Sequence, residues 1–461
     1  MADQNKQKRY FFLGIGGIGM SALARFYNAK GAEVAGYDRT RSELCKQLES
    51  EGIAIHYEDN VDMIPAQFKK SDETLIVFTP AIPAENAEFR YFKDNGFTML
   101  KRAQLLGNIT REHKGLCVAG THGKTTTCNM IANILQQTSK GCNAFLGGIA
   151  KNYGTNYILS DHSDYVVIEA YEFDRSFHWL RPWMSVITAT DPDHLDIYGT
   201  KEAYLESFRH YTTLIQPGGA LIIHKNLEMK ADVQEGVKVY DYSRDEGDFH
   251  AENIVIDNGN ITFDFVSPIE TVKGIELGQP VPINIENSVT AMAMAQLNGC
   301  NAEELRYGMK TFQGAVRRFD YKVRTPHHVF LSDYAHHPNE IFQSAKSLRE
   351  LYKDRKITAI FQPHLYTRTR DFAEGFAEAL SKVDKLILLD IYPAREEPIP
   401  GVTSEIIYDK VTAPEKVLLK KEELMGYLEK EPVDVLVTFG AGNIDRFIEP
   451  IEDMLKKRAG E

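Results

Sequence analysis

Residues 120–127, Gly-Thr-His-Gly-Lys-Thr-Thr-Thr, constrain the fold of this chain more than any other segment. An apolar run at residues 116–119 precedes them, and a helical pattern follows at residues 128–132. A strand that ends in a tight loop and continues as a helix points backbone N–H groups at a phosphate. Lys124 adds a cation, and the Thr125 hydroxyl is a possible Mg²⁺ ligand. The segment therefore predicts a nucleotide phosphate loop.

This loop is a shortened variant of the strict P-loop pattern. Val118 stands where that pattern requires a glycine. The alternative is a Gly-Lys-Thr turn that binds nothing. The strand before the loop and the helix after it favour the phosphate site.

A second glycine loop lies near the N-terminus. After an apolar run at residues 10–13, Gly14, Gly16 and Gly19 fit the pattern G-x-G-x-x-G, and a later strand ends at Asp38. This is the pattern of a dinucleotide-binding turn. NAD and a nucleotide-sugar diphosphate would suit it equally, and a purely structural turn is the third possibility.

Strands and helices alternate along the chain, which predicts parallel, doubly wound sheets and an α/β fold. A polar stretch at residues 108–114 resembles a linker, shorter β-rich runs occupy residues 220–285, and a further break is expected at residues 322–328. Further strands are predicted at residues 33–37, 74–78, 165–168, 185–188, 329–332, 357–361, 385–389 and 433–439.

Acidic residues follow two of the central strands. Glu169, directly after the strand at residues 165–168, is the candidate Mg²⁺ ligand, because a carboxylate at a strand end beside a phosphate loop is typical of nucleoside triphosphate sites. A solvated acidic turn is the alternative. His194 is either a ligand of a second metal ion or an ordinary loop histidine.

Basic residues gather in the last third of the chain. Arg318 precedes the expected break and could contact phosphates, or it could belong to a charged linker. His337, His364 and Arg368 follow predicted strands. Arginine forms bidentate pairs with carboxylate and phosphate, so this group could clamp either anion, and a solvated charged turn is the alternative.

Composition limits the partners. A net charge of −12 argues against a general nucleic-acid or anionic membrane surface. Five cysteines without a C-x-x-C pair indicate a reduced, cytoplasmic compartment. The N-terminus has no signal-peptide core, and no apolar run is long enough to span a membrane. We expect no nucleic-acid or membrane partner.

Taken together, the motifs resemble the Mur ligase family over essentially the whole length. They are Gly-Ile-Gly-Gly-Ile-Gly-Met at 14–20, the phosphate loop at 120–127, Asp-His-Leu-Asp-Ile-Tyr-Gly at 193–199, Arg-Arg-Phe-Asp at 317–320, Asp-Tyr-Ala-His-His-Pro at 333–338 and Tyr-Pro-Ala-Arg-Glu-Glu-Pro-Ile-Pro-Gly at 392–401. Their order and spacing are highly specific, and the shortened loop is itself the family's form.

The resemblance implies three domains: a Rossmann-like N-terminal domain that holds a UDP-sugar (residues 1–112), a central P-loop ATPase-type α/β domain (113–322) and a C-terminal Rossmann-like α/β domain for the amino acid (323–461). It also implies ATP and Mg²⁺ as cofactors and a monomer or homodimer. The implied reaction joins L-alanine to the lactyl carboxylate of UDP-N-acetylmuramate in peptidoglycan precursor synthesis. Attachment of a whole peptide to the same carboxylate is the alternative.

The resemblance also assigns residues to roles. Lys124, His194, His337 and Arg368 would be catalytic, and Thr125, Glu169 and His194 would ligate metal. The nucleotide would contact Gly120, Thr121, His122, Gly123, Lys124, Thr125, Thr126, Asn284, Asn287 and Arg318. The substrates would contact Gly14, Gly16, Gly17, Ile18, Gly19, Asp38, His56, Asn60, His364 and Arg368. Three positions depart from the family pattern, namely Tyr171 in place of aspartate, Ile283 in place of histidine and Leu365 in place of arginine.

Two other classes compete with a ligase. A nicotinamide-dependent oxidoreductase would use the first loop but would leave the second loop and its acidic partners unexplained. A P-loop regulatory or motor protein would use the second loop without small-molecule chemistry. Cofactor titration and substrate-dependent ATP use discriminate among the three.

Overall fold

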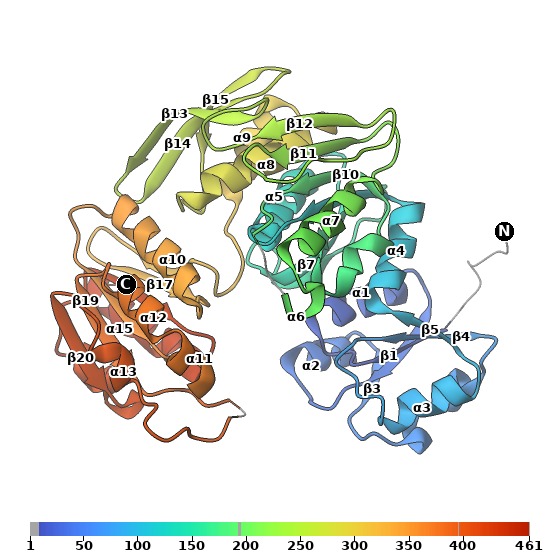
Figure 1. Cartoon of the computed structure of the whole chain (residues 1–461), viewed down its shortest axis with the longest axis horizontal. Coiled ribbons are helices and arrows are strands. Elements are labelled where there is room, and N and C mark those ends of the chain that lie inside the picture. Colours follow the sequence, from blue (N-terminus) through green and yellow to red (C-terminus); the bar gives the residue numbers. More distant parts are fainter. Residues whose placement is uncertain (1–8, 192–194, 395, 461) are drawn as a thin grey trace. The chain divides into compact units, whose positions relative to one another are not determined.

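A computed structural model describes residues 9–191, 195–394 and 396–460 (Figure 1). The chain divides into two compact units. The first comprises Met1–Glu252, Asp264–Ile275 and Glu286–Phe312, and the second comprises Asn253–Phe263, Glu276–Ile285 and Gln313–Glu461. Each unit is described by itself.

The N-terminal sheet of the first unit is wholly parallel. Its strands lie in the order β3 (Ala54–His56), β2 (Glu33–Tyr37), β1 (Arg9–Leu13), β4 (Thr74–Phe78) and β5 (Thr98–Lys101). Its helices are α1 (Ile18–Ala29), α2 (Glu43–Ser50), α3 (Ala87–Asp94) and α4 (Arg102–Glu112), with 3₁₀ turns η2 (Val61–Met63) and η3 (Ala66–Lys69). The strand order reverses at β1, so the first glycine loop lies at the switch point where such sheets bind ligands.

The second sheet of the first unit has seven strands in the order β12 (Lys238–Tyr242), β11 (Ala220–His224), β10 (Pro182–Ile187), β6 (Lys114–Ala119), β9 (Tyr165–Ala170), β7 (Asn143–Ala150) and β8 (Thr155–Ile158). Strand β6 is central and buried from Gly115 onward, which explains its apolar sequence at residues 116–119. The phosphate loop therefore leaves the middle of this sheet and enters α5 (Lys124–Gln136). Further helical segments are η4 (Phe173–Trp179), α6 (Leu195–Tyr198), α7 (Lys201–Thr212), α8 (Ile283–Leu297) and α9 (Ala302–Thr311).

One continuous apolar core joins the two sheets of the first unit. Phe26 of α1 packs against Phe145 of β7, with ring centroids 5.5 Å apart. Beside them the buried Arg25 donates to Asn156 Oδ1 at 3.0 Å and also pairs with Glu51. The helix that follows the first glycine loop is therefore fixed to the sheet that carries the phosphate loop.

The second unit contains a six-stranded sheet in the order β16 (Asp320–Arg324), β17 (Val329–Asp333), β21 (Val435–Phe439), β18 (Ile357–Phe361), β19 (Lys385–Leu389) and β20 (Glu415–Leu419). Only β16 runs antiparallel to its neighbour. Its helical segments are α10 (Pro338–Leu351), α11 (Tyr366–Asp371), α12 (Ala373–Leu380), α13 (Glu405–Tyr408), η5 (Lys421–Glu423), α14 (Leu424–Leu428), η6 (Asn443–Phe447) and α15 (Ile448–Ala459).

Three more strands form a small separate sheet, namely β13 (His250–Asp257), β14 (Asn260–Val266) and β15 (Thr271–Glu276). They lie in the region predicted to be β-rich. In the parts of the chain that the structure describes, no helix is long and apolar enough to cross a membrane.

The α/β fold class is confirmed, but two predicted connections are wrong. Residues 108–114 are no linker, because α4 continues to Glu112 and β6 begins at Lys114. That stretch looks polar in the sequence, yet Ile109 and Thr110 are buried. The expected break at residues 322–328 overlaps β16, where Lys322 pairs with the buried Asp320 at 2.7 Å.

Candidate active site

The phosphate loop has a backbone that only glycine adopts easily. Gly120 and Gly123 have φ of +132° and +79°. A Cβ on Gly120 would lie 2.1 Å from Thr188 Oγ1, which is too close for any side chain. Gly123 is the N-cap of α5 and brings the N-terminus of this helix to the loop without a side chain in the way. The loop therefore has the shape that a phosphate requires.

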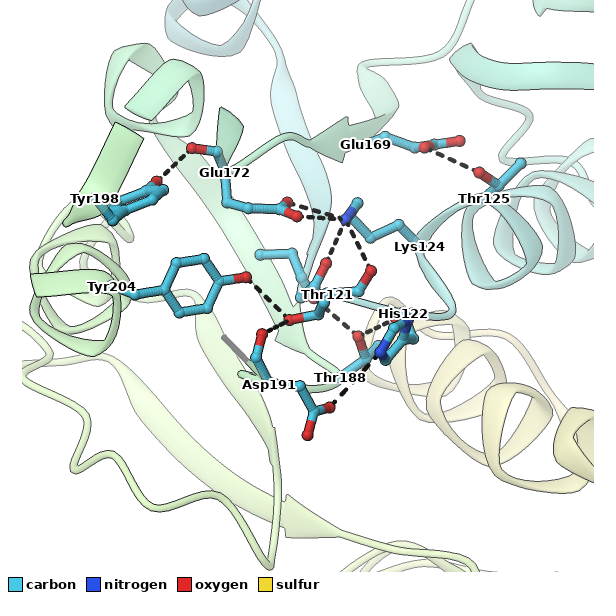
Figure 2. A network of polar contacts seen from close by, with 12 residues as sticks. Thr121, His122, Lys124, Thr125, Glu169, Glu172, Thr188, Asp191, Tyr198 and Tyr204 are labelled. Atoms are coloured by element: carbon cyan, nitrogen blue, oxygen red, sulfur yellow. Dashed lines mark hydrogen bonds and ion pairs between the residues drawn. The ribbon is translucent and has the colours of Figure 1, made fainter. Parts of the chain in front are cut away.

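Lys124 is held inside the loop by a carboxylate that the sequence did not single out. Its ammonium donates to the two carboxylate oxygens of Glu172 at 2.9 and 3.1 Å and also to the carbonyl oxygen of Gly120 (Figure 2). The two side chains are only 10% and 3% exposed. The Glu172 carbonyl in turn accepts from the hydroxyl of Tyr198. The lysine ammonium is thus fixed within the phosphate loop.

A second pair of oxygen donors lies beside it. Thr125 Oγ1 donates to Glu169 Oε2 at 3.1 Å, and the amide of Gly147 donates to Glu169 Oε1 at 2.7 Å. Both Thr125 and Glu169 are buried. Hydroxyl and carboxylate oxygens are ligands that Mg²⁺ accepts, so this pair fits the ion, with phosphate and water completing its shell. Among the described residues there is no cluster of three or more acidic, histidine or cysteine ligands.

Other residues of the phosphate loop form hydrogen bonds with residues that follow strand β10. Thr121 donates from Oγ1 to the carbonyl of Asp191 at 2.8 Å, and Thr188 Oγ1 donates to the carbonyl of His122 at 2.5 Å (Figure 2). The ring of His122 is exposed, and Thr126 is half-buried at the start of α5. These contacts fix the loop to the residues that follow β10. His194 lies outside the described residues.

The first glycine loop is closed by Asp38. Its carboxylate accepts from the amide of Gly16 at 2.9 Å and from that of Thr40 at 3.0 Å. Helix α1 follows, with Gly17 as its N-cap and no acidic residue in its first turn, which contains Ile18 and Gly19. Gly14 has a φ of +85° and turns the chain out of β1.

His56 and Asn60 lie close to each other at the end of β3. His56 Nε2 is 2.6 Å from Glu88 Oε1, and the amide of Asn60 donates to the same oxygen at 3.3 Å. Burial raises the pKa of Glu88, whose side chain is fully enclosed. The buried carboxylate of Glu88 therefore holds both the ring of His56 and the backbone of Asn60.

Helix α8 carries both predicted asparagines. Asn287 belongs to the first unit, and its Oδ1 accepts from Thr127 Oγ1 at 3.5 Å. It also lies against Gly123, where a Cβ would be 2.8 Å from its Oδ1. Asn284 belongs to the second unit and donates to Gln279 Oε1 at 3.1 Å. Asn287 is thus beside the phosphate loop.

In the second unit, His364 and Arg368 form a pair. Arg368 Nη1 lies 3.2 Å from His364 Nδ1, and the His364 ring stacks on Tyr392 with centroids 5.7 Å apart. Burial and the nearby guanidinium lower the pKa of His364. His337 is the N-cap of α10, and its ring packs edge-on against Phe372. The side chain of Arg318 is exposed.

Within the first unit, the structure brings together Lys124, Thr125 and Glu169 as the sequence predicted. The sequence analysis missed the contact of Glu172 with Lys124, Tyr171 as a packing residue, and Thr188. Glu172 lies three residues past Glu169 in the same acidic turn, so the local cluster of carboxylates was the available signal. Thr188 had no signal, because its contact depends on how β10 lies beside β6.

Comparison with protein families gives three consecutive matches. They are "Mur ligase family, catalytic domain" at residues 9–114, "Mur ligase middle domain" at 118–295 and "Mur ligase, glutamate ligase domain" at 317–442.

Curated relatives match over nearly the whole length. A UDP-N-acetylmuramate–L-alanine ligase of Phocaeicola vulgatus is 60% identical and covers 99% of this chain and 100% of its own. An enzyme of the same name from Porphyromonas gingivalis is 50% identical, with 97% and 99% covered.

Solved structures share the fold. The UDP-N-acetylmuramate-alanine ligase MurC of Thermotoga maritima superposes with a TM-score of 0.78 at 24% identity, covering 98% of this chain and 99% of that one. A murein peptide ligase of Psychrobacter arcticus superposes with a TM-score of 0.63 at 21% identity, covering 97% and 98%.

Fold and site define an α/β enzyme of the P-loop ATPase type, with a second glycine loop on a Rossmann-like sheet. The chain belongs to the Mur ligase family of ATP-dependent ligases.

Proposed function

We propose that this enzyme joins L-alanine to the lactyl carboxylate of UDP-N-acetylmuramate at the expense of ATP, in peptidoglycan precursor synthesis. The observation that carries the proposal is the 60% identity, over both full lengths, to a relative with that activity in its name. The buried Lys124 in the phosphate loop supports the use of ATP.

The domains would divide the substrates. Residues 1–112 would bind the UDP-sugar at the first glycine loop, with Gly14, Gly16, Gly17, Ile18, Gly19, Asp38, His56 and Asn60 as its contacts. Residues 113–322 would bind ATP at the phosphate loop. Residues 323–461 would bind the amino acid. Because ATP and UDP-sugars are made in the cytoplasm, the enzyme would work there.

The chemistry solves an activation problem, since a carboxylate is a poor electrophile and does not condense with an amine in water. A carboxylate oxygen attacks the γ-phosphorus of ATP, ADP leaves, and an acyl phosphate forms. The amine of L-alanine then attacks the acyl carbon. Phosphate leaves with the former carboxylate oxygen, the amine loses a proton, and an amide remains.

The residues of the first unit would neutralise charge along this route. Lys124 and the loop N–H groups would stabilise the transferring phosphoryl group, at the position where such donors have the largest effect. Thr125 and Glu169 would hold Mg²⁺, which supplies positive charge between the phosphate oxygens when bound. A second metal ion would use His194. Asn287 would contact the nucleotide beside Gly123.

The residues of the second unit would bind the remaining groups. Arg368 provides a planar guanidinium for the carboxylate of L-alanine, and His364 orients it through their contact at 3.2 Å. His337, Asn284 and Arg318 would reach the nucleotide and the transferring phosphoryl group. Three substrates and two anions have to be aligned, so positioning would supply a large part of the rate enhancement.

A substrate panel tests the proposal. Phosphate release is measured with ATP, Mg²⁺ and UDP-N-acetylmuramate together with L-alanine, glycine, L-serine or a tripeptide in turn. We expect L-alanine to give the highest kcat/KM. Preference for the tripeptide would instead support a ligase that attaches a whole peptide, and release without any UDP-sugar would contradict both. Sedimentation of the same sample would distinguish a monomer from a homodimer.

A further inference from the structure

Arg102 is a guanidinium beside the first glycine loop that none of the roles above uses. It is the first residue of α4 and follows β5 of the N-terminal sheet. A Cβ on Gly19 would lie 3.0 Å from Arg102 Nη1 and 3.2 Å from its Cδ. The arginine therefore lies directly against the first turn of α1, in space that only a glycine at position 19 leaves open.

The same guanidinium also contacts the ring of Tyr171. The distance from Arg102 Cζ to the ring centroid is 5.6 Å, and Lys124 Nζ lies 5.7 Å from the same centroid. Both distances are typical of cation–π contacts. Tyr171 directly follows β9 and its strand-end carboxylate Glu169. Arg102 is thus located where the first glycine loop comes close to the phosphate loop.

Within residues 9–191, 195–394 and 396–460, Arg102 makes no hydrogen bond to an acceptor and no ion pair with a carboxylate. Other arginines of the first unit differ: Arg25 is bonded to Glu51, and Arg9 to both Glu33 and Glu73. Burial lowers the pKa of Arg102, although the electrostatic influence of Tyr171 and Glu169 opposes this shift. A desolvated cation is costly unless an anion compensates it.

The surroundings of Arg102 are also favourable for an anion. Helix α1 has twelve residues, no side-chain hydrogen bond at its N-cap and no acidic residue in its first turn. No acid of the helix itself therefore opposes the partial positive charge of its N-terminus. The carboxylate beside it is that of Asp38, which accepts from the amide of Gly16, one residue before the N-cap. A guanidinium beside a helix N-terminus offers fork-shaped donors that match phosphate and carboxylate oxygens.

We propose that Arg102 binds an anionic group of the nucleotide-sugar substrate, either its diphosphate or its lactyl carboxylate. The inference rests on the proposed function for the identity of that substrate. It adds a binding residue from the end of the first domain that faces both loops. The diphosphate and the lactyl carboxylate both accept charge-assisted hydrogen bonds from a guanidinium. Titration with two different ligands distinguishes between them.

The test is calorimetric titration of the full chain, without ATP, by UDP-N-acetylmuramate and by UDP-N-acetylglucosamine, which has the diphosphate but no lactyl acid. We expect R102Q to weaken binding of UDP-N-acetylmuramate about 10- to 100-fold, as loss of a charge-assisted contact does. A diphosphate contact would weaken both ligands alike. A carboxylate contact would weaken only the first.

Two further variants separate binding from packing. R102K keeps the charge without the planar fork, and we expect it to bind between wild type and R102Q. R102M keeps the aliphatic stem over Gly19 and should bind as weakly as R102Q, whatever its melting temperature. The matched control is R111Q on the same helix, since Arg111 is exposed and bonded to Asn108. It should bind both ligands like wild type.

The outcomes distinguish this inference from the proposed function. Wild-type affinity of R102Q and R102M for both ligands would overturn the role of Arg102 alone. Failure of the wild-type enzyme to bind either sugar nucleotide would overturn the proposed function and this inference together.

Discussion

The ammonium of Lys124 lies 2.9 and 3.1 Å from the two carboxylate oxygens of Glu172, and both side chains are almost fully buried. Glu172 is therefore the acidic partner of Lys124 in the protein without nucleotide. A phosphate that binds in the loop has to share or replace this carboxylate. The pair links the stability of the central domain to its ability to bind a nucleotide.

The first prediction concerns the contribution of this pair to the protein's free energy of unfolding. K124M or E172M alone leaves one buried charge without its partner, which typically costs about 3–5 kcal/mol. The double variant K124M/E172M leaves none, so we expect it to lose less than the sum of the two. Urea denaturation of the four proteins measures the coupling. Additive losses would show that the two charges do not interact. As a surface control, K46A removes the exposed pair with Glu43 and should cost at most about 1 kcal/mol.

The second prediction concerns the backbone of the loop. G120A places a methyl group 2.1 Å from Thr188 Oγ1 at a φ of +132°. We expect a lower melting temperature and a loss of ATP binding, read out by thermal unfolding and titration. The matched control is G426A in α14, where nothing lies within 4 Å of the new methyl group. It should bind ATP normally and gain up to about 1 kcal/mol from helix propensity. Equal behaviour of the two variants would contradict the close approach.

The third prediction concerns the metal. T125V removes the hydroxyl that lies 3.1 Å from Glu169 but keeps the side-chain volume. We expect the Mg²⁺ concentration for half-maximal phosphate release to rise at least about tenfold, because one oxygen ligand is lost. T125S restores the hydroxyl and should restore the wild-type dependence. If T125V and wild type respond to Mg²⁺ identically, Thr125 does not hold the ion.

The fourth prediction concerns pH. The pKa of His364 is lowered by burial and by Arg368, so the ring stays neutral until the pH falls below its ordinary pKa of about 6.5. Protonation then removes the acceptor for Arg368 and adds a like charge. We expect kcat/KM for L-alanine to fall on the acid side, below about pH 6.5, and this limb to be missing in H364N. An unchanged acid limb in H364N would assign it to another group.

The stability of the fold is expected to depend on pH in the same direction as kcat/KM. A histidine with a lowered pKa in the folded state binds its proton more readily when unfolded. Above about pH 6.5 the ring is neutral in both the folded and the unfolded state, so its lowered pKa has no effect on stability. As the pH falls below that value, protonation of the unfolded state lowers the free energy of unfolding.

Much of the fold could be predicted from local sequence. The strands β2, β4, β18 and β19 have the predicted bounds, because each is an apolar run that ends at a polar residue or a loop. The prediction of a linker at residues 108–114 was wrong because this short stretch mixes polar and apolar residues. Arg111 and Glu112 are exposed, while Ile109 and the polar Thr110 are buried, and a mixed pattern over few residues does not reveal a helix end.

The candidate site was predictable only where one loop carries it. Lys124 and Thr125 are adjacent in sequence. Glu169, predicted directly after its strand, is the penultimate residue of β9 and is paired with Val118 of β6. The contact of Arg102 with Gly19 and Tyr171 joins three segments that are distant in sequence. No local pattern encodes such a contact, because it depends on how two sheets pack against each other.

The most direct test of the central claim follows one oxygen atom. UDP-N-acetylmuramate labelled with ¹⁸O in both oxygens of its lactyl carboxylate is turned over with ATP, Mg²⁺ and L-alanine, and the released phosphate is analysed by mass spectrometry. Transfer of the γ-phosphoryl group to that carboxylate predicts one ¹⁸O atom in every phosphate released. Phosphate that contains no ¹⁸O would contradict the account.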